Sequence, residues 1–287
     1  MAKGSELKGR IKSVENTRKI TRTLEMIATS KMKRSQDRVI AARPYARALA
    51  DVISSLYSKD LEGDFPLLRQ PKVVKNAAVL LLTSNRGMAG GFNANLIKEA
   101  RALIARLEGD GTTVELHVSG RKGGGYFRYV ARAMATSRTD IGDKPTASDA
   151  ASLVDALMTQ YAKGEIDAVY VVCAQYKSAL SSPPVAERVL PVAPPASAAG
   201  QKNFLLFPDA GAILSELLPA YVRNAVYKAL VETVAAEQAA RRTAMKAATD
   251  NAGEMLNLLR RTYNRARQAQ ITQEIAEIVG GAEALQG

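Results

Sequence analysis

The chain has 287 residues, of which 47% are hydrophobic and 5% aromatic, and its formal net charge is +12. The single histidine excludes a metal site built on several histidines, and the single cysteine excludes an intramolecular disulfide. A low cysteine content is typical of proteins in a reducing compartment. No segment approaches the roughly 18 consecutive apolar residues of a membrane-spanning helix, and the first residues lack the apolar core of a secretory signal.

Residues 1–60 are predicted to form one long amphipathic helix, because apolar or small side chains recur every three or four positions. This stripe consists of Leu7, Ile11, Val14, Thr17, Ile20, Leu24 and Ile27, followed by Ala28, Met32, Ser35, Val39, Ala42, Ala46, Leu49, Ile53 and Leu56. A helix of about 55 residues is roughly 80 Å long, so it needs a second long element to cover its stripe. Residues 1–59 also contain fourteen Lys and Arg against five Asp and Glu, which indicates an acidic partner.

After a linker at residues 61–75, residues 76–200 are predicted to form an α/β domain. Strands are expected at 77–83, 113–119 and 167–174, and helices at 93–107 and 148–162. Thr146 and Asp149 form a capping box at the start of the second of these helices. Strands that alternate with helices favour a mostly parallel, Rossmann-like sheet. The proline-rich stretch 181–200 is expected to mark the end of the domain, with no strand predicted in it.

The turn NRGMAGGF, residues 85–92, raises the question of phosphate binding. Its glycines, Gly87, Gly90 and Gly91, match neither the Walker spacing nor the dinucleotide spacing, and the glycine-rich stretch 120–129 matches neither as well. We therefore predict that the glycines shape a turn and that the chain binds no nucleotide or other cofactor. His117 and Cys173 lie in strand-like segments and are predicted to be buried structural residues.

The C-terminal segment, residues 201–287, is predicted to be a second long helix. Its stripe consists of Ala248, Ala252, Met255, Leu259, Tyr263 and Ala266, continued by Ile271, Ile275, Ile278, Ala282 and Leu285. Between residues 241 and 267 there are seven basic residues against two acidic ones. Two long helices at opposite ends of one chain favour an antiparallel coiled coil with the α/β domain inserted between them. A basic helical bundle without a special task would have the same periodicity.

Three segments together resemble the gamma subunits of F-type ATP synthases, of the bacterial type: residues 10–38, the turn after the first strand, and residues 237–285. The resemblance covers essentially the whole chain. It implies a non-catalytic rotor shaft without cofactor or metal, standing inside a ring of alpha and beta subunits. The α/β part is then expected to meet the epsilon subunit and the membrane rotor ring of c subunits. Proton-driven rotation of that ring would be coupled to ATP synthesis or hydrolysis, on the cytoplasmic face of the bacterial inner membrane, with membrane association only through the complex.

The resemblance also implies which residues make contacts. Those expected against the acidic loops of the beta subunits are Arg241, Arg267, Gln268, Thr272 and Leu24, the last at a position where the family often has Met. The expected apolar tip in its bearing consists of Ile275, Ile278, Val279 and Leu285. Phe204 and Phe207 are expected at the foot toward the rotor ring, with Phe207 where the family often has Glu. A solvated or merely helix-stabilising role is the alternative for the beta contacts.

A basic helical nucleic-acid-binding protein is the alternative from another class, since it would place the same Lys and Arg side chains on phosphates. The low aromatic content and the need of the basic helices to pair with each other argue against it, so no nucleic acid is expected as a partner. A nucleotide-dependent enzyme ranks third, because both phosphate motifs fail.

Overall fold

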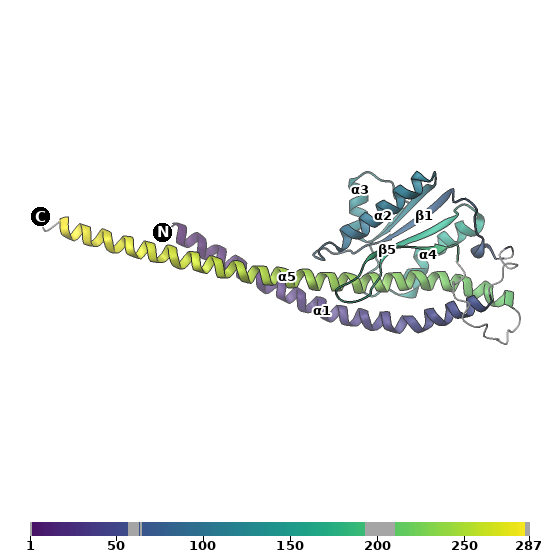
Figure 1. Cartoon of the computed structure of the whole chain (residues 1–287), viewed down its shortest axis with the longest axis horizontal. Coiled ribbons are helices and arrows are strands. Elements are labelled where there is room, and N and C mark those ends of the chain that lie inside the picture. Colours follow the sequence, from purple (N-terminus) through teal and green to yellow (C-terminus); the bar gives the residue numbers. More distant parts are fainter. Residues whose placement is uncertain (1, 57–62, 64, 193–209, 285–287) are drawn as a thin grey trace. The chain divides into compact units, whose positions relative to one another are not determined.

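The computed structural model describes residues 2–56, 63, 65–192 and 210–284 (Figure 1). The chain divides into two compact units, the first made of Met1–Ala28 with Arg242–Gly287 and the second of Thr29–Arg241. Two long helices, α1 (Ala2–Leu56) and α5 (Ala210–Ala284), each contribute to both units.

The first unit is an antiparallel pair of helical segments. Thr249 on α5 hydrogen-bonds Thr21 on α1, and Arg260 pairs with Glu15, so residues further along α5 meet residues earlier on α1. The seam between the segments contains side chains that are buried or half-buried: Leu7, Ile11, Val14, Thr21, Leu24, Ala28, Met245, Thr249, Ala252, Leu256, Leu259 and Tyr263. The predicted coiled coil of the two termini is therefore confirmed.

Part of the predicted stripe is wrong. Ile20 is 60% exposed, Ile27 47% and Met255 54%, and Thr17 is exposed as well. A polar residue, Thr21, takes the seam position in their place. The seam of a two-helix pair accepts a polar residue that finds a partner across it, as Thr21 does in Thr249.

The second unit holds a five-stranded sheet in the order β3-β2-β1-β4-β5. Four strands are parallel, and β5 pairs antiparallel with β4. The strands are β1 (Asn76–Leu82), β2 (Thr113–Ser119), β3 (Thr136–Arg138), β4 (Ala168–Ala174) and β5 (Pro184–Leu190). Strand β1 is buried from its second residue to its last, which explains why its sequence, NAAVLLL, is continuously apolar rather than alternating.

Helices cover both faces of the sheet (Figure 1). Helices α2 (Phe92–Gly109) and α3 (Arg121–Tyr129) pack on the face that holds Val79, and α4 (Ala147–Lys163), the short helix η2 (Pro66–Leu68) and parts of α1 and α5 pack on the face that holds Leu80. The predicted capping box is confirmed, since the amide of Asp149 donates to Thr146 Oγ1 and the amide of Thr146 donates to Asp149 Oδ2. The arrangement is the Rossmann-like fold expected from the sequence.

Four elements were not predicted: η2, α3, β3 and β5. Strand β5 lies in the stretch where no strand was expected, and that expectation is wrong for residues 184–190. Its prolines are compatible with a strand because β5 is at the edge of the sheet, where Pro184 is the first residue and Pro191 follows the last. Helix α3 contains three consecutive glycines, which reads locally as a turn.

His117 and Cys173 are buried, as predicted. His117 Nδ1 lies 2.9 Å from Thr136 Oγ1, and burial lowers the pKa of the imidazole, with the carboxylate of Glu115 opposing this shift. Burial raises the pKa of the Cys173 thiol to about 12, so this side chain is not a thiolate nucleophile at neutral pH.

Candidate partner-binding surfaces

The carboxyl ends of β1 and β2 are where a Rossmann-like sheet binds phosphate, at the amino end of the following helix. In this chain the first three amides of α3 are already bonded to the chain itself. Arg121 N donates to Asn85 Oδ1 (2.9 Å), Lys122 N to Ser84 O (3.1 Å) and Gly123 N to Thr83 Oγ1 (3.0 Å). A phosphate would therefore find no free amides at this helix end.

The glycines at this edge have backbone roles. Gly90 has a φ of 58° and Gly120 a φ of 108°, in the region that side chains disfavour. A Cβ on Gly120 would lie 2.1 Å from the carbonyl oxygen of Thr83, so β1 and the start of α3 can approach this closely only at a glycine. These two positions support the prediction that the glycines shape turns.

Helix α5 closes the same edge of the sheet. Thr233 Oγ1 accepts a hydrogen bond from Ala174 N (3.2 Å), just at the end of β4, and Arg241 donates from Nε and Nη2 to Gly87 O at 3.3 and 3.2 Å. Glu237 and Asp143 line the 520 Å³ hollow beyond β1. Both carboxylates are paired within the chain, Glu237 with Arg241 and Asp143 with Lys31, so side chains of α5 and α1 take up this edge of the sheet.

The predicted beta-subunit contacts differ in their surroundings. Arg267, Gln268 and Thr272 are exposed on α5, while Leu24 is half-buried on α1. Arg241 is only 8% exposed, and its Nη2 lies 2.6 Å from Glu237 Oε1 in addition to its bonds with Gly87. Arg241 therefore differs from the other four predicted contact residues, because its guanidinium already has partners inside the chain.

The predicted apolar tip is fully uncovered within the part of the chain that the structure describes. Every side chain from 271 to 282 is exposed, including Ile275 (56%), Ile278 (71%) and Val279 (53%). These residues and Ile271 (43%) follow a spacing of three or four, so they share one helix face. Leu285, Phe204 and Phe207, also predicted to make contacts, lie outside the described residues.

The first unit also exposes large apolar side chains outside the predicted tip. Those that are at least 47% exposed are Ile20, Met26, Ile27, Met255 and Leu258. The sequence could have indicated this exposure, because the two helical segments carry more apolar residues than one seam between two helices can bury. Exposed apolar groups of this size mark interaction surfaces.

None of the described helices is both long enough and apolar enough to cross a membrane.

Residues 3–285 match the family model described as ATP synthase. A protein of Gemmatimonas aurantiaca named ATP synthase gamma chain is 68% identical over 290 residues, covering 100% of both chains. The chain belongs to the ATP synthase gamma chain family. A second gamma chain, from Leptospira biflexa, is 43% identical over 99% of this chain and 100% of its own length.

Solved structures share the fold of this gamma chain family member. One is a chain of the Euglena gracilis mitochondrial ATP synthase, solved as OSCP/F1/c-ring in rotational state 3, with 18% identity, a TM-score of 0.70 and coverage of 99% of this chain and 95% of that one. Another comes from the central stalk and c-ring of the Tetrahymena thermophila mitochondrial ATP synthase, with 22% identity and a TM-score of 0.63. The match covers 80% of this chain and 99% of that one. The predicted family, fold and non-catalytic role are confirmed, and the nucleic-acid alternative receives no support.

Proposed function

We propose that this gamma chain is the central rotor shaft of an ATP synthase. It couples rotation of a membrane ring of c subunits to ATP synthesis or hydrolysis in a ring of alpha and beta subunits. The observation that carries this role is the uncovered apolar face at residues 271–282, since such a face requires a surrounding partner in water. The first three amides of α3 are bonded within the chain, so this helix end has none of them to offer a phosphate.

Contacts with the ring follow from the exposed side chains. Arg267, Gln268 and Thr272 meet acidic loops of the beta subunits, and Leu24 contributes from α1, because a basic surface gains affinity and orientation from an acidic one. The apolar tip turns in an apolar bearing and consists of Ile275, Ile278 and Val279, with Leu285 as a further member outside the described residues. Arg241 has a different role, because its hydrogen bonds to Gly87 O hold that turn in place. It contacts the beta loops only through the small part of its side chain that is exposed.

In this proposal the shaft is made of residues 1–60 and 201–287, and the foot is the domain 76–200, joined through the linker 61–75. The foot meets the epsilon subunit and the c ring, with Phe204 and Phe207 facing the ring. The complex stands on the cytoplasmic face of the bacterial inner membrane, and the chain reaches the membrane only through it. No helix of the described chain has a membrane-spanning character of its own.

The test is purification from the native membrane under mild detergent, using an affinity tag on the gamma chain. The expected result is a complex in which alpha and beta subunits are recovered in threefold excess over gamma, together with epsilon and c subunits. Recovery of the tagged chain free of alpha and beta subunits, or bound to nucleic acid, would refute the assignment.

A further inference from the structure

A second hollow of the second unit lies away from the glycine turn. It has a volume of 680 Å³ and is bordered by α1, the connection between β4 and β5, β5 itself and α5. It shares no lining residue with the hollow beyond β1. Its size falls within the range of about 300–1,000 Å³ that is usual for small-molecule sites.

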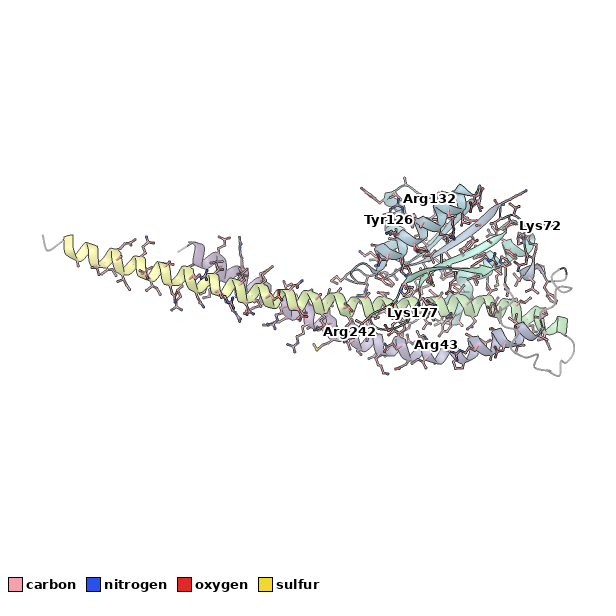
Figure 2. The ribbon with its side chains drawn as sticks, viewed as in Figure 1. Arg43, Lys72, Tyr126, Arg132, Lys177 and Arg242 are labelled. Carbon is pink, nitrogen blue, oxygen red and sulfur yellow. The ribbon has the colours of Figure 1, made fainter. Side chains whose placement is uncertain are left out.

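Five cationic residues line this hollow. They come from four different elements: Arg43 and Arg47 from α1, Lys177 from the connection after β4, Arg188 from β5 and Lys228 from α5. Figure 2 shows Arg43 and Lys177 projecting from separate segments of the chain. Only two carboxylates, Glu187 and Glu232, share the lining, so the hollow holds an excess of positive charge.

One of the two carboxylates already has a partner in the chain. Glu232 is 6% exposed, and its Oε2 accepts a hydrogen bond from the amide of Tyr176 at 3.2 Å. Burial raises the pKa of Glu232, while the charges of Lys228 and Arg43 lower it. None of the ion pairs within the described ranges involves the five cations as a partner.

We propose that this hollow is a binding site for a polyanion that carries two or more linked phosphate groups. A single phosphate could meet only part of a cluster that spans four elements, whereas linked phosphates can contact several of these cations at once. Guanidinium and ammonium groups are suited to this task because they form charge-assisted hydrogen bonds with phosphate oxygens. Tyr221 and Asn224, which also line the hollow, supply further donors.

The ligand can come from two sources with the same chemistry: a soluble polyphosphate or a lipid headgroup with two phosphates. The soluble source is tested by titrating the full-length chain with inorganic tripolyphosphate in a calorimeter. We expect saturable binding of one ligand per chain that weakens as salt is added, since the attraction is screened. The double variant Arg43→Gln with Lys228→Gln should weaken binding by about a hundredfold, because each of the two lost charge-assisted contacts is worth about a factor of ten.

A matched control removes the same charge elsewhere. Lys98 and Arg101 line a different hollow, beside α2, so the double variant Lys98→Gln with Arg101→Gln should change the affinity by less than about twofold. Equal weakening in both double variants would mean unspecific attraction and would overturn the proposal. Circular dichroism of each variant verifies that it is folded.

A second measurement needs no variant. Lysine acetylation of the wild-type chain, mapped by mass spectrometry, should be slowed at Lys177 and Lys228 by tripolyphosphate and unchanged at Lys98. Unchanged acetylation at all three lysines with tripolyphosphate present would overturn the site. Flotation with vesicles that contain a two-phosphate lipid distinguishes the sources: binding that is lost in the Arg43→Gln, Lys228→Gln variant assigns the headgroup as the ligand.

Discussion

Glu237 and Arg241 stand one turn apart on α5 and form an ion pair of 2.6 Å, with only 8% and 10% of their side chains exposed. The same guanidinium donates to Gly87 O, so one buried side chain connects the helix to the turn after β1. Burial raises the pKa of Glu237, and Arg241 opposes this shift more strongly than any other group. The carboxylate therefore depends on the arginine for its charge.

Arg241→Ala should destabilise the chain by about 3–5 kcal/mol at neutral pH, because it leaves a buried carboxylate without its partner. A raised native pKa means that the contribution of Glu237 to stability is complete below its ordinary value of 4.5 and is lost as pH rises through the native pKa. Without Arg241 the native pKa rises further, so the cost of the variant should be larger at about pH 8 than at about pH 5. Denaturant unfolding of the full chain at both pH values measures this. In the Arg241→Ala, Glu237→Gln variant the added pH dependence should disappear; a cost independent of pH in the single variant would contradict the explanation.

Gly120→Ala should lower the stability of the second unit, because its Cβ would lie 2.1 Å from Thr83 O and its φ is 108°. The φ of 108° with a ψ of 137° lies in a sparsely populated region that costs about 1–3 kcal/mol for a residue with a side chain. The matched control is Gly125→Ala, on the same helix, where a Cβ meets nothing within 4 Å. The control should be neutral or slightly stabilising, since alanine favours a helix. Thermal unfolding of both variants decides, and equal melting temperatures would refute the role of Gly120.

Thr249→Val should cost about 0.5–1.5 kcal/mol, since it removes the 2.8 Å hydrogen bond to Thr21 in the buried seam. Converting both threonines to valine should restore most of this loss, because no buried hydroxyl is then left without its partner across the seam. A double-mutant cycle by denaturant unfolding measures the coupling. Thr262→Val, on the exposed side of the same helix, is the control and should change stability little. Additive effects of the two seam variants would show that the bond does not couple the helices.

Amide exchange should be fast at residues 271–282 of the isolated chain and slower at residues 245–256, because only the latter include buried seam residues. Assembly with alpha and beta subunits should slow exchange at 271–282, as the bearing covers the apolar face. Hydrogen–deuterium exchange with mass spectrometry compares the two states. Slow exchange at 271–282 in the isolated chain would contradict the need for a partner.

Arg267→Ala with Gln268→Ala should leave the complex assembled but reduce ATP hydrolysis and ATP-driven proton pumping. Both side chains are exposed on α5, so the chain itself should fold normally. A charge-assisted hydrogen bond is worth about 1.5–3 kcal/mol where it is desolvated, which is small for a large interface but can slow one rotational step. The control is Arg265→Ala with Asn264→Ala, exposed on the same helix. Wild-type values in both assays would remove Arg267 and Gln268 from the coupling surface.

The sequence was sufficient for the strands and helices whose pattern is local. Strands β1, β2 and β4 and helices α2 and α4 were predicted to within two residues at each end, because local hydrophobic patterns mark them and a capping box marks the start of α4. Helix α3 could not be predicted, since its glycines are required by contacts with distant residues. A Cβ on Gly123 would lie 2.8 Å from Thr83 Oγ1, and one on Gly124 would lie 2.8 Å from Ser137 Oγ.

For the candidate surfaces, too, local patterns could be predicted from the sequence, whereas contacts between distant residues could not. Periodicity placed Ile275 and Ile278 on the same stripe as Ala252, because it cannot distinguish a face covered by the chain from one left for a partner. The buried pairing of Arg241 depends on Gly87, which lies 154 residues earlier, and no local pattern records such a contact. The family resemblance supplied the contact residues, but only the structure shows that Arg241 is held inside the chain.

Polar bonds fasten both long helices to the loops beyond one edge of the sheet. On α5, Thr233 is bonded to the end of β4 and Arg241 to the turn after β1, while on α1 Lys31 pairs with Asp143. Rotating either helix about its own axis within the second unit would strain bonds to several loops at once, and the loops are backed by a five-stranded sheet. The crevice in which related folds hold a ligand is thus crossed by side-chain bonds that oppose twisting of the two helices against the sheet.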